Sequence, residues 1–424
     1  MLNIKYLREN EKEAKKKLAT RGISKKQIGE VLGLDKKRRV LLSKIEDIRA
    51  LQNKASSEIA KMKNKKKREE IITKVKKAAK NLKELENNLK EVEEKLKKQL
   101  TLFPNLPLDE VPVGKDEKDN KLIKEVKGGV EPFNFKPKDY LTLAEDLDLI
   151  DVKRAAKISG TRFGYLKNEA VLLEFALVQF TLETLLKENF IPVVPPVMLK
   201  EEPMWAMGYI DKARDEIYHL EKDNLFLVGT AEQSIGAMHM NEILNEKDLP
   251  LRYIGFSTAF RREAGSYGKD TKGILRVHQF DKLEMFVFAT PTESKRELEN
   301  LVSLQEKLVG ALRIPYRLVE GCSGDLAHPA ARTIDLEMWL PSEKKYRETH
   351  SASSCTDFQA RRLKTRYRGK DNKVRLVHTL NATAFAIGRT LIGIIENYQQ
   401  EDGSIKVPEV LQKYTGGLKE IKKE

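Results

Sequence analysis

The feature that most constrains the fold is a highly charged segment, residues 35–100, that carries two apolar seams. Small or apolar residues recur there at heptad spacing on both sides of the polar run 63–70. The first seam comprises Leu41, Ile45, Ile48, Ala55, Ile59 and Met62 with Gln52 filling one gap, and the second comprises Val75, Ala78, Leu82, Leu85, Leu89, Val92 and Leu96. A stripe this narrow needs a partner helix to cover it, whereas the polar run has nothing to bury. The segment therefore predicts an antiparallel helical hairpin with its tip near residues 63–70.

This hairpin also holds most of the excess positive charge of the chain. Segment 35–100 contains 22 basic and 11 acidic residues, a net +11 of the +15 carried by all 424 residues. Near the tip, residues 63–83 carry a net charge of +8. On charge alone two functions stay open. One is a solvated coiled coil that spaces or dimerises the molecule, and the other is a cationic rod that contacts the phosphates of an RNA duplex.

After the hairpin, three prolines end the helical pattern and a second domain follows. Pro104, Pro107 and Pro112 cannot continue a helix, so residues 104–137 are predicted to be an extended linker. From about residue 138 onward, strands alternate with shorter helices. The predicted domains are therefore residues 1–103, which include the hairpin, and residues 138–424, a larger α+β domain.

Composition indicates the cellular compartment of the protein and argues against a cysteine-rich zinc protein, a membrane protein and a secreted protein. The two cysteines, Cys322 and Cys355, fit a reducing compartment and are too few for a cysteine-rich zinc site. No apolar run reaches the length of a membrane span, and the N-terminus lacks the pattern of a signal or transit peptide. We therefore expect a cytoplasmic protein without a membrane partner.

The most informative stretch for function is residues 260–286. Two runs that read as antiparallel strands, 251–260 and 274–288, flank a glycine-rich loop. Such a loop can present backbone N–H groups to an anion, and Arg261 and Arg276 at its ends can each bind phosphate oxygens with two N–H groups. The stretch predicts a site for a nucleoside triphosphate. The alternative is a basic surface hairpin.

This stretch, with its sequence FRREAG followed by RVHQFDKLE, closely resembles motif 2 of class II aminoacyl-tRNA synthetases, specifically the seryl-tRNA synthetases. Further matching blocks occur in family order at residues 1–10, 165–177, 228–233, 346–362 and 380–399. The resemblance implies an α+β class II catalytic domain, with an antiparallel sheet flanked by helices, and an N-terminal coiled-coil arm. It also implies a homodimer, because the helix predicted at 169–189 and the strand after it are similar to motif 1 of the family, which lies at the dimer interface. An ordinary core helix before an edge strand is the alternative there.

The family resemblance implies that ATP and Mg²⁺ activate L-serine to seryl-adenylate and that serine is then transferred to tRNA(Ser). It leaves open whether tRNA(Sec) is a second acceptor. The arm would bind the long variable arm of the tRNA. The candidate tRNA-binding residues are the basic ones near the tip, namely Lys63, Lys65, Lys66, Lys67, Arg68, Lys74, Lys76, Lys77 and Lys80.

The matching blocks also supply candidate residues for the reaction centre. By resemblance, serine would contact Thr230, Ala231, Glu232, Arg261, Glu284 and Thr383. ATP would contact Arg261, Arg262, Glu263, Val277, His278, Gln279, Phe280, Glu348, Thr349, His350, Ser351 and Arg389. Glu348 and Ser351 would hold Mg²⁺, which prefers oxygen ligands. The candidate catalytic residues are Arg261, Glu284 and Arg389.

Some of these residues have ordinary interpretations as well. Glu263 and Phe280 could be plain strand residues, whereas Arg389 lies in an apolar helix and would be costly there without an anionic partner. The chain also departs from the family at NATA (381–384), at ETHSASSC (348–355) and in segment 204–220, which replaces a glycine-rich loop. Two rival functions are an enzyme that activates a small amino acid and loads it onto a carrier protein, and a non-catalytic RNA-binding homologue.

Overall fold

The computed structural model describes residues 1–424 except 62–64, 131–132, 211–213, 265–271 and 424. It divides into two compact units, Met1–Pro104 and Asn105–Glu424. Each unit is described by itself below.

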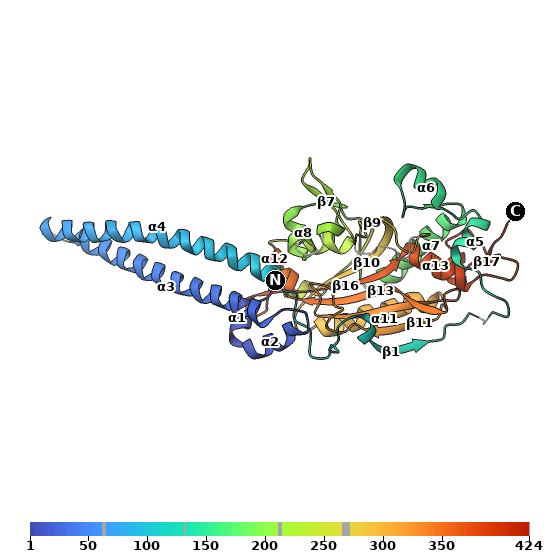
Figure 1. Ribbon diagram of the computed structural model, residues 1–424, viewed down its shortest axis with the longest axis horizontal. Helices are drawn as coiled ribbons and strands as arrows, with labels where there is room; N and C mark the ends of the chain where they lie inside the picture. Colours follow the sequence, from blue (N-terminus) through green and yellow to red (C-terminus); the bar gives the residue numbers. More distant parts are fainter. Residues whose placement is uncertain (62–64, 131–132, 211–213, 265–271, 424) are drawn as a thin grey trace. The chain divides into compact units, whose positions relative to one another are not determined.

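The N-terminal unit is a helical hairpin with two short helices beside its base (Figure 1). Helices α3 (Lys25–Lys61) and α4 (Lys65–Thr101) have 37 residues each and pack antiparallel, and α1 (Ile4–Glu9) and α2 (Glu11–Ala19) precede them. The heptad prediction is confirmed for the seam residues that the structure describes, all of which are buried or half-buried, whereas Met62 lies outside the described residues. Gln52 in the seam is half-buried, whereas its neighbour Leu51 is 63% exposed.

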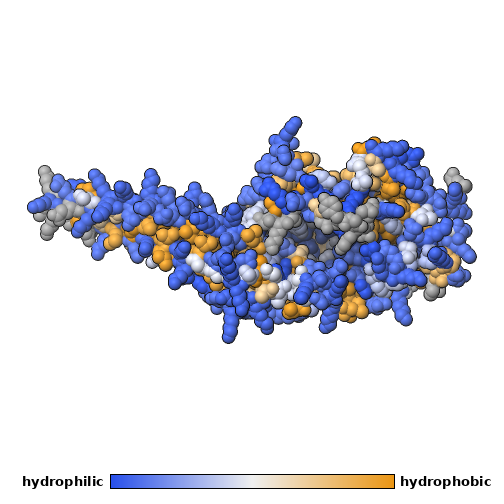
Figure 2. Space-filling model, in the orientation of Figure 1, coloured by the Kyte–Doolittle hydropathy of each residue, from blue (hydrophilic) through white to orange (hydrophobic). Residues whose placement is uncertain are grey.

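Ion pairs join the two long helices along the hairpin. Arg38 bonds Glu93 at 2.8 Å, and Arg49 bonds Glu86 at 2.7 Å. At the base, the carboxylate of Asp35 is buried and accepts hydrogen bonds from Arg8 at 2.8 Å and from Arg39 at 3.1 Å. Exposed pairs stabilise little individually, so the apolar seam carries most of the packing energy. The surface in view is largely hydrophilic, with apolar patches along the hairpin (Figure 2).

The C-terminal unit is built on an eight-stranded sheet in the order β1-β11-β12-β13-β16-β10-β9-β4 (Figure 1). Every neighbouring pair is antiparallel except β4 and β9, which are parallel. The strands, in sheet order, are β1 (Lys121–Val126), β11 (Tyr316–Glu320), β12 (Arg332–Leu340), β13 (Lys345–Thr356), β16 (His378–Ala386), β10 (Gln279–Ala289), β9 (Leu251–Phe260) and β4 (Ile191–Val193).

Successive residues of strand β10 point to opposite faces of the sheet. One face packs in the main hydrophobic core, and the other face carries both a second core and a polar region. Leu283, Met285 and Val287 belong to the main core, together with residues of α7 (Glu169–Leu186), α11 (Ser294–Ala311) and α13 (Ile387–Asn397). Alternate residues face the other way. There, Phe286 and Phe288 pack in a second core with α8 (Glu201–Met207), α10 (Ala231–Ala237) and α12 (Phe358–Leu363), while Lys282 and Glu284 line a cavity.

The remaining elements of this unit are short. They are η1 (Glu117–Asp119), α5 (Tyr140–Asp146), β2 (Ile150–Asp151), α6 (Val152–Ser159), β3 (Tyr165–Leu166), β5 (Met198–Lys200), η2 (Arg214–Glu216), β6 (His219–Leu220), β7 (Leu225–Leu227), β8 (Ile243–Asn245), η3 (Glu246–Asp248), β14 (Arg366–Arg368), β15 (Val374–Leu376), β17 (Ile405–Lys406), α14 (Glu409–Gln412) and β18 (Glu420–Ile421). Among the helices that the structure describes, none has both the length and the apolar character needed to span a bilayer.

Two sequence-based expectations need correction. Within the predicted linker 104–137, residues 121–126 form the edge strand β1, which pairs with β11. Charged residues are common on sheet edges, so KLIKEV gave little strand signal. The strand predicted from residue 274 begins only at Gln279, because residues 274–278 follow an irregular path and help to line the cavities described below.

Candidate active site

Two adjoining cavities lie on the polar face of the large sheet. The larger has a volume of about 560 Å³ and the smaller about 130 Å³. Their common wall consists of Arg261, Glu263, Arg276, Lys282, Ser351 and Thr383. A ligand with two parts can therefore occupy both cavities and place its junction beside this wall.

Buried carboxylates dominate one end of the larger cavity. Strand register sets Glu284 of β10 directly opposite Thr383 of β16, and the two residues are 1% and 5% exposed. Glu232 in the first turn of α10 is also buried. The side chain of Thr230 caps that helix by accepting a hydrogen bond from the backbone N–H of Glu232 at 3.4 Å. Carboxylates and a hydroxyl are therefore concentrated in one small volume.

Two neutral donors hold the carboxylate of Glu232. The hydroxyl of Tyr209 donates to Oε2 at 2.7 Å, and the amide of Gln359 donates to Oε1 at 3.0 Å. Burial, and secondarily the charge of Glu284, raises the pKa of Glu232 above its usual value. Burial also raises the pKa of the Tyr209 hydroxyl, so that this group stays a donor at neutral pH.

Arginines frame the common wall. Nε of Arg261 donates to the carbonyl of Gly229 at 3.1 Å, and its guanidinium lies 5.3 Å from the ring centroid of Phe280. Arg276 donates to Glu263 at 2.7 Å. The cavity walls thus present fixed cations next to an aromatic platform, an arrangement suited to a nucleotide.

Arg389 has the anionic partner that its apolar helix demanded. It lies in the first turn of α13 and donates to the backbone carbonyl of Glu348 at 2.7 Å, with the Glu348 carboxylate 3.7 Å away. Glu348 in turn lies close to Asp335, which bonds Ser351. Burial and the charge of Glu348 raise the pKa of Asp335 to about 8. Crowded carboxylates beside a hydroxyl offer the oxygen ligands that a hard divalent cation prefers.

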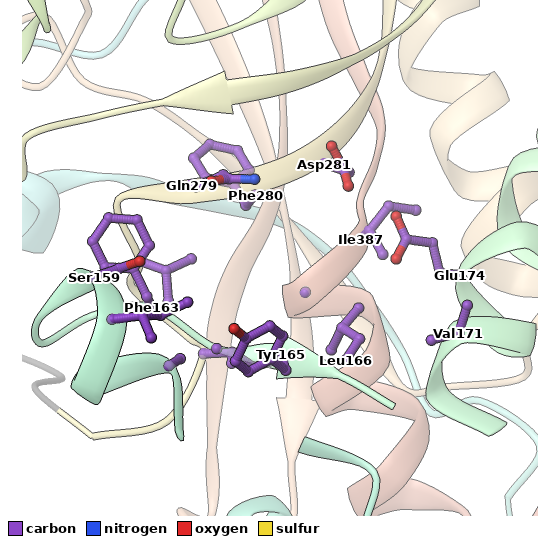
Figure 3. Close-up of a pocket in the computed structure, with 16 residues that line it drawn as sticks. Ser159, Phe163, Tyr165, Leu166, Val171, Glu174, Gln279, Phe280, Asp281 and Ile387 are labelled. Atoms are coloured by element: carbon purple, nitrogen blue, oxygen red, sulfur yellow. The ribbon is translucent and has the colours of Figure 1, made fainter. Parts of the chain in front are cut away.

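A third cavity, of about 410 Å³, shares Ile274, Val277, Phe280 and Gly388 with the smaller cavity. Figure 3 shows the carboxylates of Glu174, from α7, and Asp281, from β10, on the same side of this cavity. Burial and the nearby Asp281 raise the pKa of Glu174 to about 8. Asp281 also accepts a hydrogen bond from Thr258 at 2.6 Å.

The structure brings most of the predicted site residues together. Those that line the two adjoining cavities are Thr230, Glu232, Arg261, Glu263, Val277, Phe280, Glu284, Glu348, Thr349, Ser351, Thr383 and Arg389. Sequence reasoning had assigned neither Lys282 nor Tyr209. The sequence did contain a signal for Lys282, because it lies two residues before Glu284 in a predicted strand and so shares a face with it.

Five predicted residues have side chains outside the two adjoining cavities, and their contacts with ATP or serine stay predictions. Ala231 is packed in the second core, and Gln279 lines the third cavity. The guanidinium of Arg262 lies over Tyr218, at 5.9 Å. His278 bonds the carbonyl of Arg261 at 3.0 Å, and His350 packs edge-on against Phe385 in the main core. For His350, alternation along strand β13 explains the position, because its neighbours Thr349 and Ser351 line the smaller cavity.

The predicted tRNA-binding residues are exposed wherever their side chains are described. These are Lys66, Arg68, Lys74, Lys76, Lys77 and Lys80. Lys63 and the side chains of Lys65 and Lys67 lie outside the described residues. The assignment of these residues to tRNA stays a prediction.

Comparison with known proteins identifies the family. The family model "Seryl-tRNA synthetase N-terminal domain" matches residues 1–107, and the model "tRNA synthetase class II core domain (G, H, P, S and T)" matches residues 217–398. A serine–tRNA ligase from Dictyoglomus thermophilum is 48% identical to this chain, and the alignment covers 100% of the chain and 99% of the relative. The chain belongs to the seryl-tRNA synthetases.

Solved structures of seryl-tRNA synthetases agree over nearly the whole length of the chain. The enzyme from Pyrococcus horikoshii, complexed with ATP, has a TM-score of 0.94 and 44% identity, and the match covers 99% of both chains. The cytoplasmic enzyme from Naegleria fowleri, complexed with AMP, has a TM-score of 0.88 and 32% identity over 100% of this chain and 99% of that one. Family membership confirms the predicted fold class and the prediction of a class II serine–tRNA ligase.

Proposed function

We propose that this seryl-tRNA synthetase forms seryl-adenylate in the two adjoining cavities, with serine in the larger and the adenosine of ATP in the smaller. The observation that carries the proposal is the common wall, where Arg261 and Lys282 border both cavities. A carboxylate oxygen of serine would attack the α-phosphorus there, and the bond to pyrophosphate would break. No covalent enzyme nucleophile is needed, because positioning and charge neutralisation supply the catalysis.

Serine recognition rests on the carboxylate end of the larger cavity. Glu284 would accept the α-ammonium, Thr383 opposite it would bond the side-chain hydroxyl, and Thr230 and Glu232 would complete the contacts. Arg261 would hold the substrate carboxylate. A buried site built to bond a hydroxyl rejects an analogue without one by roughly 10⁴–10⁵-fold, so alanine would be excluded. Threonine would be excluded by shape.

Nucleotide binding rests on the smaller cavity. Phe280 and Val277 would hold the adenine ring, Glu263 would bond its amino group, and Arg389 would contact the ring or the γ-phosphate. The related Pyrococcus horikoshii and Naegleria fowleri enzymes were solved with ATP and AMP, which supports this assignment. Glu348 and Ser351 would hold Mg²⁺ with phosphate oxygens and water, and the crowding of Glu348 and Asp335 supports a cation there. When bound, Mg²⁺ would neutralise phosphate charge.

The second half-reaction would transfer serine to the terminal ribose of tRNA(Ser). A ribose hydroxyl would attack the carbonyl carbon of the adenylate, and AMP would leave. The exposed basic residues of the hairpin would contact the long variable arm of the tRNA through its phosphates. We extend the proposal to tRNA(Sec) as a second acceptor, because phosphate contacts carry little sequence information.

A homodimer is proposed from apolar surface on α7 and the strand after it. Phe175 is 54% exposed and Val194 is 82% exposed, and further exposed residues nearby are Leu172, Leu186 and Ile191. Large apolar side chains gathered on one surface are typical of an interface. Light scattering of the Phe175→Asp variant should report monomers.

We also propose a cytoplasmic location, since both cysteines are free and buried, and cell fractionation would test it.

Serine-dependent ATP–pyrophosphate exchange, followed by charging of tRNA(Ser) and tRNA(Sec) transcripts, tests the proposal. We expect exchange with serine but little with alanine or threonine, and charging of both transcripts. Exchange without charging of any tRNA would favour the carrier-protein function. No exchange with any of the three amino acids would reject adenylate formation and favour the non-catalytic homologue.

A further inference from the structure

Lys282 occupies a place that neither motif matching nor the proposed mechanism explains. It is only 8% exposed, yet its side chain borders both cavities. Its ammonium forms an ion pair with the carboxylate of Glu284 and donates a hydrogen bond to Oγ1 of Thr230 at 3.3 Å. The ammonium of Lys282 therefore contacts two of the groups that serine is proposed to contact, Glu284 and Thr230.

The charges around Lys282 are unequal in number. Two buried carboxylates, Glu232 and Glu284, face this end of the cavity, and Lys282 supplies one cation. The other titratable or charged groups that line the cavity around the cluster are Tyr209, Glu216, Arg261, Glu263, Arg276 and Cys355.

Most of these neighbouring groups do not change the net charge at the carboxylate end of the cavity. Glu263 and Arg276 pair with each other. Burial raises the pKa values of Tyr209 and Cys355, so both groups stay neutral near pH 7. Glu216 accepts a hydrogen bond from the backbone of Ala264 at 3.1 Å, and Arg261 is proposed to hold the substrate carboxylate. When Glu232 and Glu284 are both ionised, their end of the cavity is therefore one cation short, and the α-ammonium of serine would supply that cation.

We propose that Lys282 is a positioning residue for serine: it neutralises one of the two buried carboxylates and holds Glu284 in line with Thr230, so that the cavity accepts a substrate with a single ammonium group. This inference rests on the proposed function. Without Lys282, two carboxylates would lie side by side in a buried site, which is costly unless they take up a proton. Serine binding would then compete with that proton.

Lys282→Met tests the inference, because methionine keeps the length and apolar stem of lysine but removes its charge. We expect the KM for serine in ATP–pyrophosphate exchange to rise at least about 100-fold and to become strongly dependent on pH between about 6 and 8. Thermal stabilisation by ATP alone should stay close to that of the wild type. Lys282→Arg should restore part of the serine affinity. The exposed Lys247→Met is the matched control and should leave every value unchanged.

A second variant keeps the inference testable if Lys282→Met folds poorly. Lys282→Ala leaves space for a small cation, so ethylammonium chloride should lower its serine KM, whereas tetramethylammonium chloride at the same ionic strength should not. Three outcomes would overturn the inference: an unchanged serine KM with a flat pH profile, a loss of kcat at constant KM, or an equal loss of ATP binding. A wild type that lacks serine-dependent exchange would instead reject the proposed function itself.

Discussion

The hairpin and the serine cavity both depend on charge, but they use it in opposite ways. On the hairpin, basic residues such as Lys74 and Lys77 are exposed, and their positive charges together produce an electrostatic field along the hairpin surface. In the cavity, Glu232, Lys282 and Glu284 are almost fully buried, and each side chain is held by a specific neighbour. Exposed charges are screened and interchangeable, whereas buried ones are neither. Substitutions should therefore have graded effects on the hairpin and large individual effects in the cavity.

Glu284→Ala provides the strongest test of this contrast. The change should reduce serine-dependent ATP–pyrophosphate exchange by roughly 10³-fold or more, because it removes the proposed ammonium ligand and leaves Lys282 buried without its anion. Exchange kinetics measure the loss, and circular dichroism checks that the fold survives. The exposed Glu221→Ala should behave as the wild type. Near-normal exchange in Glu284→Ala would show that serine is bound elsewhere.

The hairpin should respond in a graded way. Replacing Lys74, Lys76, Lys77 and Lys80 by alanine preserves helix propensity and removes four cations. Affinity for tRNA(Ser) should fall, and the slope of log K against log salt should decrease by about 0.7–0.9 for each phosphate that the variant no longer neutralises. Filter binding at several salt concentrations measures this, while serine-dependent exchange should stay within about twofold, since the change lies outside the cavities.

The matched control for that variant carries the same change in charge at the other end of the hairpin. Lys36, Lys37, Lys90 and Lys98 are exposed and outside the predicted tRNA-binding set. Their replacement by alanine should weaken tRNA binding less. Equal losses in the two variants would mean that only total charge matters and that the tip has no special role.

Tyr209→Phe should have a smaller effect within the cavity. The change removes the hydroxyl that donates to Glu232 at 2.7 Å and keeps the ring. A hydrogen bond to a charged group contributes about 1.5–3 kcal/mol, which corresponds to roughly a 10–100-fold higher serine KM. Exchange kinetics over a range of serine concentrations measure the change. An unaltered KM would show that Gln359 alone holds Glu232 in place.

The same contrast explains what the sequence could predict. The heptad seam is a local pattern, so the exposure of Leu51 and the partial burial of Gln52 followed from residue spacing alone. The cavity is assembled from segments far apart in the chain, and its residues were predicted through family resemblance. Tyr209 lies in segment 204–220, which departs from the family, so no motif pointed to its contact with Glu232. His350 fell in a matching motif, yet the alternation of strand β13 turns its side chain into the core.

The smallest expected effect concerns the carboxyl pair in the third cavity. The pKa of Glu174 is raised to about 8 in the folded chain, above its ordinary value of 4.5. The folded state therefore binds a proton that the unfolded state releases, so this group stabilises the fold below about pH 4.5 and the contribution is lost as pH rises towards 8. Glu174→Gln keeps the shape and removes the titration. The melting temperature of the wild type should fall between pH 6 and 8.5, and that of the variant should fall by a few degrees less, at roughly 2 °C per kcal/mol for a chain of this size. Parallel pH profiles for the two proteins would mean that Glu174 does not gain a proton on folding. The buried carboxyl group of Glu174 would then resemble the exposed charges of the hairpin in its small effect on stability.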